Sequence, residues 1–326
     1  MNTRTPLRLA LLGLCVLSSA AMSRAQIIDP IFAGSYSFRD LGTPASVPGP
    51  LGGLTLQAGN VNSLLVGGGA NGPSGAIYSV GLNRTILGDG LSHVTSFSGP
   101  GTQFATAPNI DGGLTYGPGG VLFATTFSNN QLLQYKPGST APDKIIDLNA
   151  LGISSSTGTI SFTPGGQAVI ASYSASRFYG ATFTPDGGGT YDFALTGSSV
   201  ATSNGPEGIL YVPSGSPVFS TLDPAASWML LTEYGAGKIT AYKSDASGLP
   251  IPLTGIDFMT NVPGAEGAAL DPTTSDFLFS TFGGGNRVLA VSGFALVAIP
   301  EPGTLALALL GSLGLGIAGR RKKKRL

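Results

Sequence analysis

The chain has 326 residues, of which 50 are Gly and 23 are Pro, and only 10% of its side chains are charged. So much Gly and Pro disfavours a helical bundle or a coiled coil, whereas 42% hydrophobic residues can bury a core and exclude wholesale disorder. The formal charge of zero conceals an acidic body, because residues 26–299 hold 8 Lys or Arg against 16 Asp or Glu, a net charge of −8. A body of that sign predicts no nucleic acid partner.

Residues 1–25 have the pattern of a secretory signal peptide. Arg4 and Arg8 form a positive start, an apolar run covers residues 9–21, and a Ser-Arg-Ala sequence then places small residues before a cleavage site. The run is shorter than the ~20 residues that a bilayer requires, which favours cleavage over an uncleaved anchor. Since Cys15 is the single cysteine and lies in this run, the mature chain is predicted to have none.

The C-terminal region has three features in a fixed order. A linker over 296–302 contains a Pro-Glu-Pro tripeptide, and its two prolines prevent a helix there. An apolar stretch of 17 residues follows at 303–319, long enough for a transmembrane helix in a thin bilayer. The tail at 320–326 contains six consecutive cations, which are Arg320, Arg321, Lys322, Lys323, Lys324 and Arg325. Cations hold such a tail in the cytoplasm, so the body is predicted to lie outside the inner membrane.

This order resembles the PEP-CTERM sorting signal of exported bacterial proteins. The resemblance implies that Pro300, Glu301 and Pro302 are the sorting motif and that exosortase, a membrane protease, processes the chain at or near them. It also implies a Gram-negative host that makes extracellular polysaccharide. The protein would be held transiently in the inner membrane and would then reach the cell surface or the extracellular matrix. A plain C-terminal anchor is the alternative, and it has the same topology.

The region between these signals repeats one pattern five times. Each copy has a Gly, an alternating apolar stretch, a Pro-centred turn in most copies, a second apolar strand that ends in Ser, Thr or Gly, and usually a third strand. The turns stand at positions 58, 118, 164, 213 and 272, with steps of 60, 46, 49 and 59 residues. Strands of about five residues at this period predict one four-stranded propeller blade per repeat.

We therefore predict an all-β fold, a β-propeller of five to seven blades over residues 51–295, with six blades favoured. The segment 26–50 is a candidate for closing the propeller, and its residues 31–41 for completing a sixth blade. A β-sandwich or a β-solenoid is the alternative, but a sandwich does not explain the recurring turn. The body resembles the NHL, lactonase-like and related propellers, on phrases such as Gly205–Ile209 and Gly264–Ala268, each opening a strand. That mixed group implies a fold and little about function.

Two carboxylates occupy the same place in neighbouring repeats. Glu207 and Glu266 each stand six residues before the turn proline, and Asp111 stands seven before its own. Because equivalent positions in neighbouring blades are close in space, these side chains could face one axis. The resemblance to lactonase-like propellers implies a calcium ion near the central channel, with Asp111, Glu207 and Glu266 as ligands beside Asn109 or Asn204. The alternative is that these carboxylates accept hydrogen bonds from the adjacent Gly-rich turns or face solvent.

Hydrolytic catalysis has little support in the sequence, and no catalytic residue is assigned. His93 is the only histidine and lies in a strand-like alternation, which favours a structural role over a catalytic base. No Ser occupies a nucleophile elbow. Two functions are left open. The first is a non-enzymatic exported protein whose propeller binds extracellular polysaccharide or protein, without a cofactor unless calcium is bound. The second is a calcium-dependent extracellular lactonase or hydrolase.

Overall fold

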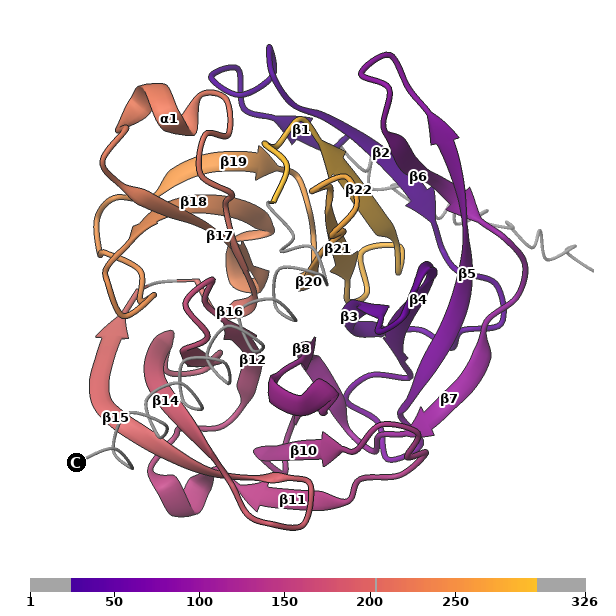
Figure 1. Ribbon diagram of the computed structural model, residues 1–326, viewed down its shortest axis with the longest axis vertical. Helices are drawn as coiled ribbons and strands as arrows, with labels where there is room; N and C mark the ends of the chain where they lie inside the picture. The colour runs from indigo at the N-terminus through magenta and orange to yellow at the C-terminus, as the bar shows by residue number, and fades with distance from the viewer. Residues whose placement is uncertain (1–24, 203, 298–326) are drawn as a thin grey trace, which may run out of the picture.

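The computed structural model describes residues 25–202 and 204–297. In this part the chain forms five antiparallel sheets that stand around a central axis as the blades of a propeller (Figure 1). The innermost strands neighbour one another in a closed ring, which runs β3, β8, β12, β16, β20 and back to β3. The predicted β-propeller is confirmed. It has five blades, within the predicted range but one fewer than the favoured six.

Each blade is named in chain order and its strands are given from the axis outward. Blade 1 has β3 (Leu51–Gln57), β4 (Asn60–Gly68), β5 (Ala76–Ile86) and β6 (Ser92–Phe97), and β7 (Thr102–Thr106) also pairs with β5. Blade 2 has β8 (Ile110–Tyr116), β9 (Leu122–Thr126), β10 (Gln131–Tyr135) and β11 (Lys144–Asp147). Blade 3 has β12 (Thr157–Phe162), β13 (Ala168–Ser172), β14 (Arg177–Pro185) and β15 (Tyr191–Ala201).

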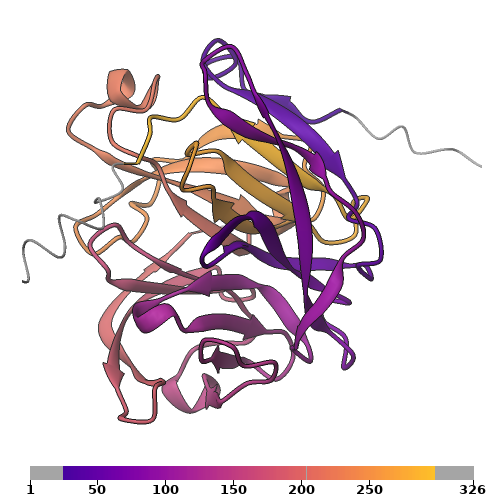
Figure 2. The same ribbon diagram turned by 45° about the vertical axis from the view of Figure 1, so that its right-hand side comes forward.

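The last two blades each take a strand from the N-terminal segment. Blade 4 has β16 (Pro206–Tyr211), β17 (Ser227–Glu233), β18 (Lys238–Ser244) and β19 (Ile256–Thr260), with β1 (Ile27–Ile28) at its outer edge. Blade 5 has β20 (Ala265–Leu270), β21 (Phe277–Thr281) and β22 (Val288–Ser292), with β2 (Ser37–Gly42) outermost. Figure 2 shows the indigo N-terminal strand beside the yellow C-terminal strands. The two ends of the described chain therefore close the ring together.

The blade count differs from the favoured six because the two longest intervals between repeat turns contain additional strands, a helix and loops that belong to existing blades. The first step contains the long hairpin of β5 and β6 together with β7, all in blade 1. The last step contains the helix α1 (Phe219–Leu222) and the loop between β18 and β19, both in blade 4. Residues 37–42 complete the fifth blade by pairing with β22, so no strand of residues 25–202 and 204–297 is left over for a sixth.

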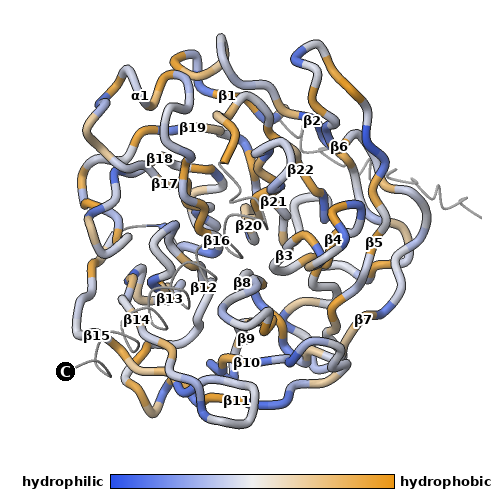
Figure 3. The backbone as a smooth tube through the Cα atoms, in the orientation of Figure 1, coloured by the Kyte–Doolittle hydropathy of each residue, from blue (hydrophilic) through white to orange (hydrophobic). Residues whose placement is uncertain are grey.

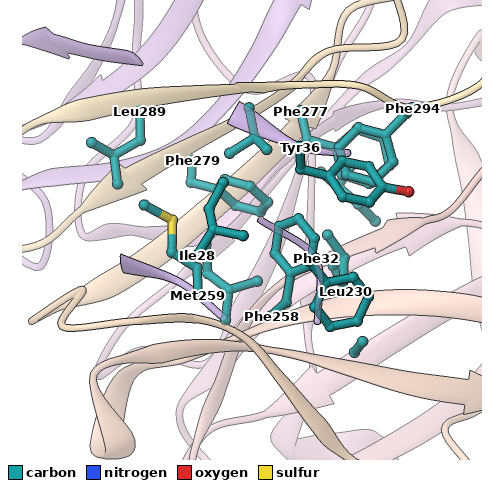
Figure 4. Close-up of a cluster of buried hydrophobic side chains, with 14 of the residues drawn as sticks. Ile28, Phe32, Tyr36, Leu230, Phe258, Met259, Phe277, Phe279, Leu289 and Phe294 are labelled. Atoms are coloured by element: carbon teal, nitrogen blue, oxygen red, sulfur yellow. The ribbon is translucent and has the colours of Figure 1, made fainter. Parts of the chain in front are cut away.

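One hydrophobic cluster fills each of the five interfaces between neighbouring blades. Hydrophobic segments, orange in Figure 3, recur along the strands of the blades, and blue polar segments mark outer strands such as β6 and β11 as well as loops. The largest cluster lies between blades 4 and 5, where Phe32, Tyr36 and Phe294 pack with rings from both blades (Figure 4). A sheet that buries both faces against its neighbours reads as nearly continuous apolar sequence, which explains runs such as Phe277–Phe279.

Within residues 25–202 and 204–297, the structure contains no helix of the length and hydropathy that a membrane span requires. The predicted transmembrane stretch at 303–319 lies outside the described residues, as do the sorting tripeptide and the basic tail. The predicted signal peptide also lies outside them, except for Ala25.

Candidate metal centre on the propeller axis

Every inner strand has an irregularity near its start, where it carries more residues than the second strand it pairs with. The register shifts between Leu51 and Leu54 in β3, Ile110 and Leu114 in β8, Thr157 and Thr159 in β12, Pro206 and Gly208 in β16, and Ala265 and Ala268 in β20. β-Bulges of this kind redirect a side chain. The three predicted carboxylates all fall within these bulges, and the other two bulges hold Gly52 and Gly158.

The bulges bring the three carboxylates together. Asp111, Glu207 and Glu266 each offer a carboxylate oxygen, and these atoms all lie within 4.8 Å of one another. The three residues are 2%, 4% and 1% exposed. The end of the propeller where the inner strands begin is called the carboxylate end below, and the opposite end, where each inner strand turns into the second strand, is called the base.

Glycine at the neighbouring positions makes room for these side chains. A Cβ atom at Gly158, the equivalent position in blade 3, would collide with the Glu207 carboxylate and with the backbone of Pro206. A Cβ at Gly112 would collide with the Glu207 backbone carbonyl and lie 3.0 Å from its side-chain Oε2. Two blades therefore supply no side chain to the centre, so that three carboxylates can converge.

The carboxylates are not fully hydrogen-bonded. The Oδ2 of Asp111, the Oε2 of Glu207 and the Oε1 of Glu266 are buried and have no hydrogen-bond partner among the described residues. Leaving a buried polar group unpaired costs about 1–3 kcal/mol, and more when it is charged. Each of the three adjacent acids therefore has one buried oxygen that a ligand could use.

Burial also makes all three groups hard to ionise. It raises the pKa of Asp111 to about 8, against the opposing effect of hydrogen bonds from Glu266 and the Gly112 backbone. Burial and then the charges of Asp111 and Glu266 raise the pKa of Glu207 well above its usual range. Burial and the Asp111 charge do the same for Glu266. Adjacent buried carboxyl groups cannot all be charged without a compensating cation.

A ring of side chains surrounds the carboxylate end. In blades 2 to 5 it consists of the residue that directly follows the second strand, which is Phe127, Tyr173, Tyr234 and Phe282 in turn. In blade 1 it is Ala70, two places beyond the end of β4. Each donates its backbone N–H, at 2.7–3.1 Å, to the carbonyl two residues before the bulge position of its own blade. We call this ring the collar. It was not predicted from the sequence.

Among the collar side chains, Tyr234 is the one whose pKa the carboxylate cluster shifts. Burial raises the pKa of Tyr234, and the charges of Glu266, Tyr173 and Glu207 raise it further, because a phenolate would be repelled by them. The Tyr234 ring meets Tyr173 and Phe282 at centroid distances of 5.7 and 6.0 Å. Three of the five collar residues therefore form one aromatic group at the carboxylate end.

Hydroxyl side chains near the end of the second strands fix the bulges. The Thr125 hydroxyl accepts the Gly113 N–H at 2.9 Å and donates to the Gly158 carbonyl of the next blade at 3.1 Å. Ser280 makes the same pair with Gly267 and Gly52, at 2.9 and 2.6 Å. Thr232 donates to the Glu266 carbonyl. In blades 2, 4 and 5 the Ser or Thr of the repeat pattern therefore connects neighbouring blades around the axis, a role that the sequence pattern left unassigned.

The remaining candidates lie elsewhere. His93 is buried on β6, where its ring nitrogens contact Asp276 at 2.7 Å and Asp89 at 2.8 Å. Asp276 belongs to the turn between β20 and β21, at the base, so His93 is remote from the carboxylate cluster along the blade. The side-chain amide of Asn204 donates to Glu233 at 3.3 Å.

Comparison with known proteins identifies the C-terminal signal. Residues 298–322 match the family model described as PEP-CTERM protein-sorting motif, a range that contains Pro300, Glu301 and Pro302 and the first three cations of the basic tail. No curated protein matches the chain. Similar solved structures include a glutaminyl cyclase from Myxococcus xanthus, with 14% identity and a TM-score of 0.43, covering 78% of this chain and 95% of that one.

Two further structures have the same degree of similarity. The PQQ-bound aldose sugar dehydrogenase of Streptomyces coelicolor has 12% identity and a TM-score of 0.42, covering 79% of this chain and 98% of that one. A putative 6-phosphogluconolactonase from Bacteroides uniformis has 16% identity and a TM-score of 0.41, covering 74% of this chain and 66% of that one. Likeness at this level bears on no activity of the present chain. The chain is therefore a β-propeller whose residues 298–322 match the PEP-CTERM sorting motif, a signal that implies export, transient membrane anchoring and recognition by exosortase.

Proposed function

We propose that this chain is an exported, non-catalytic propeller that binds a calcium ion on its axis and acts at the cell surface or outside the cell. The observation that carries the proposal is the convergence of Asp111, Glu207 and Glu266, whose buried oxygens lie within 4.8 Å of one another and include one without a partner on each residue. These carboxyl groups can be charged together only if a cation compensates them.

The donor chemistry favours calcium. Every side-chain donor in the cluster is a carboxylate oxygen, and hard oxygen donors suit calcium or magnesium rather than the sulfur and nitrogen sites of zinc. The Pro206 carbonyl lies beside the Glu207 carboxylate, since a Cβ at Gly158 would collide with both, and calcium accepts carbonyl ligands in irregular geometry more readily than magnesium does. A divalent ion offsets two of the three negative charges, and one carboxyl group can keep its proton.

The position favours a structural ion over a catalytic one. The three residues are at most 4% exposed, so the ion would join three inner strands rather than meet a substrate. His93, the only histidine, pairs through its two ring nitrogens with Asp89 and Asp276, on another part of the fold. We therefore do not favour the lactonase or hydrolase. We propose extracellular polysaccharide as the ligand class, because the half-buried rings of the collar offer flat apolar faces at the carboxylate end.

Thermal unfolding of the chain in calcium and in chelator tests the ion site. Binding at a concentration of 100 times Kd stabilises a protein by about 2.7 kcal/mol, which is a rise of roughly 5–10 °C in melting temperature for a chain of this size. Glu207→Gln and Glu266→Gln each keep the shape of the side chain and remove a charge. We expect both variants to lose the calcium-dependent rise and, in chelator, to melt at or above the parent because repulsion is relieved.

Glu233→Gln is the matched control. Glu233 is also a buried glutamate of blade 4, at 1% exposure, but its oxygens accept hydrogen bonds from Thr240 and Tyr242. Whatever this variant does to stability, it should keep the calcium-dependent rise. A parent chain that melts at the same temperature in calcium and in chelator would sink the proposal.

A further inference from the structure

The described chain leaves the propeller at the base, opposite the carboxylate end. After β22, residues 293–297 stay on the body, where the N–H of Ala295 donates to the Ser216 hydroxyl at 3.1 Å and the N–H of Val297 to the Ser275 hydroxyl at 2.8 Å. Ser216 and Ser275 both lie in connections from the first to the second strand of their blades, and these connections form the base. The fold therefore fixes the point from which the sorting signal continues.

The connection from this point to the predicted membrane segment is short. Val297 is held on the body, and only residues 298–302 precede the apolar stretch that begins at Gly303. Five residues span at most about 18 Å even when fully extended. The base must consequently stay within that distance of the membrane for as long as the chain is anchored.

Exposed hydrophobic side chains gather at the same place. Six of them occupy loops at the base of blades 4 and 5, which are Ile31, Leu222, Ile251, Leu253, Leu296 and Val297. We call these six the base patch. Leu253 is the extreme case, because the residue is fully exposed, at 103% of its reference area. Isolated exposed leucines need no explanation, but a group of them beside a membrane tether does.

The residues of the base patch are positioned by the buried core beneath them. Ile31, Leu222 and Leu296 each lie within three residues of a ring in the buried aromatic cluster of Figure 4. In that cluster, Phe32 and Phe219 have ring centroids 5.1 Å apart, and Phe219 and Phe294 6.4 Å. Ile251 joins the group through Lys243, whose carbonyl accepts its N–H at 2.8 Å and whose ammonium pairs with Asp223, next to Leu222, at 2.6 Å.

We propose that the base patch lies on the lipid bilayer while the chain is anchored, so that the carboxylate end and the collar point away from the membrane. Apolar side chains gain free energy on entering the bilayer interface, in proportion to the area they bury there. The tether adds a high effective concentration of membrane, so that a patch too weak to bind alone can dock. Since the body is acidic, with a net charge of −8 over residues 26–299, the contact is apolar and needs no anionic lipid.

The same reasoning explains how docking can be reversible. Processing at the sorting signal removes the tether and with it the effective concentration. The six apolar side chains of the base patch then act alone, because the acidic body adds no electrostatic attraction to the bilayer. Their burial is too weak to hold the propeller there. The base patch therefore orients the precursor and releases the processed protein.

Fluorescence quenching by lipid tests this proposal. The full chain has one cysteine, Cys15, so a Cys15→Ser background allows single-cysteine variants to be labelled with an environment-sensitive dye. Leu253→Cys and Ile31→Cys place the dye on the base patch, and Phe127→Cys places it on the collar, at a side chain 40% exposed. Each full chain is reconstituted in nanodiscs of zwitterionic phosphatidylcholine that contains spin-labelled lipid.

We expect loss of fluorescence and a blue shift at positions 253 and 31, and neither at 127. Equal quenching at all three positions, or none at 253 and 31, would overturn the proposal. Quenching that needs added exosortase would also overturn it, because the patch would then be a surface for the protease. All three sites are exposed loops, and melting temperatures equal to the parent confirm that each labelled chain is folded.

Discussion

Protons and calcium compete for the same buried oxygens at the carboxylate cluster. Burial raises the pKa of Asp111 to about 8 and that of Glu207 and Glu266 well above the usual range. A carboxyl group with a raised folded pKa stabilises the fold fully below its unfolded pKa of about 4, and loses that contribution as pH rises toward the folded value. Without calcium, we therefore expect the melting temperature to fall between about pH 5 and about pH 8.

Saturating calcium should flatten or reverse that slope, because the ion stabilises the charged form. Calorimetric titration near pH 6 in two buffers of different protonation enthalpy should show that about one or more protons leave as calcium binds. Equal binding heats in the two buffers would contradict the idea, as would a melting temperature without calcium that rises over the same pH range. Glu207→Gln removes one of the groups and should reduce the slope.

The second strand of a blade is the element that sets the position of the next inner strand. Thr125, near the end of β9, connects the Gly113 N–H of its own blade to the Gly158 carbonyl of the next. Thr125→Val keeps the shape and removes both hydrogen bonds, which leaves two buried backbone groups without that partner. We expect a loss of about 2–4 kcal/mol in the free energy of unfolding, measured by urea titration.

Thr85→Val is the comparison for that variant. Thr85 also lies in a strand and hydrogen-bonds to Thr95 at 3.1 Å, but it is exposed. Water can replace the lost partner there, so the free energy of unfolding should change by no more than about 0.5 kcal/mol. Similar losses in the two variants would show that Thr125 does not connect the blades.

At the scale of the whole molecule, the N-terminal segment closes the ring. β2 pairs with β22 through residues such as Phe38 and Val291, and Phe32 and Tyr36 between β1 and β2 fill the cluster at the base. Deletion of residues 26–42 would leave the edge of β22 unpaired and expose apolar surface of blades 4 and 5. We expect the shortened chain to aggregate or to lose its cooperative melt, as size-exclusion chromatography and circular dichroism would show.

Because the deletion removes two strands and several core side chains together, a point substitution is the milder comparison. Phe32→Ala keeps β1 and β2 and removes one fully buried ring. It should cost about 3–5 kcal/mol and leave the protein monomeric. If the chain without residues 26–42 were monomeric and melted like the parent, the N-terminal strands would not be needed for closure.

Several properties of this protein follow from local sequence alone. The sorting signal depends only on the order of a proline-flanked glutamate, an apolar stretch and a basic tail. It can therefore be recognised in the sequence without knowledge of the tertiary structure. The repeat of strand, turn and Ser- or Thr-ended strand likewise predicts a propeller, because each blade is a local unit of the chain. The shared register of Glu207 and Glu266 pointed to the axis for the same reason.

Other properties depended on contacts between distant parts of the chain, and only the tertiary structure decided them. The blade number was one, because pairing of residues 37–42 with β22 is a long-range contact that no period in the sequence reveals. The bulge that brings Asp111 to the two glutamates was another, since two extra residues in β8 offset its different spacing from the turn. Burial, the pKa values, the collar and the base patch all depend on which surfaces the closed ring covers, and that is a property of the whole molecule.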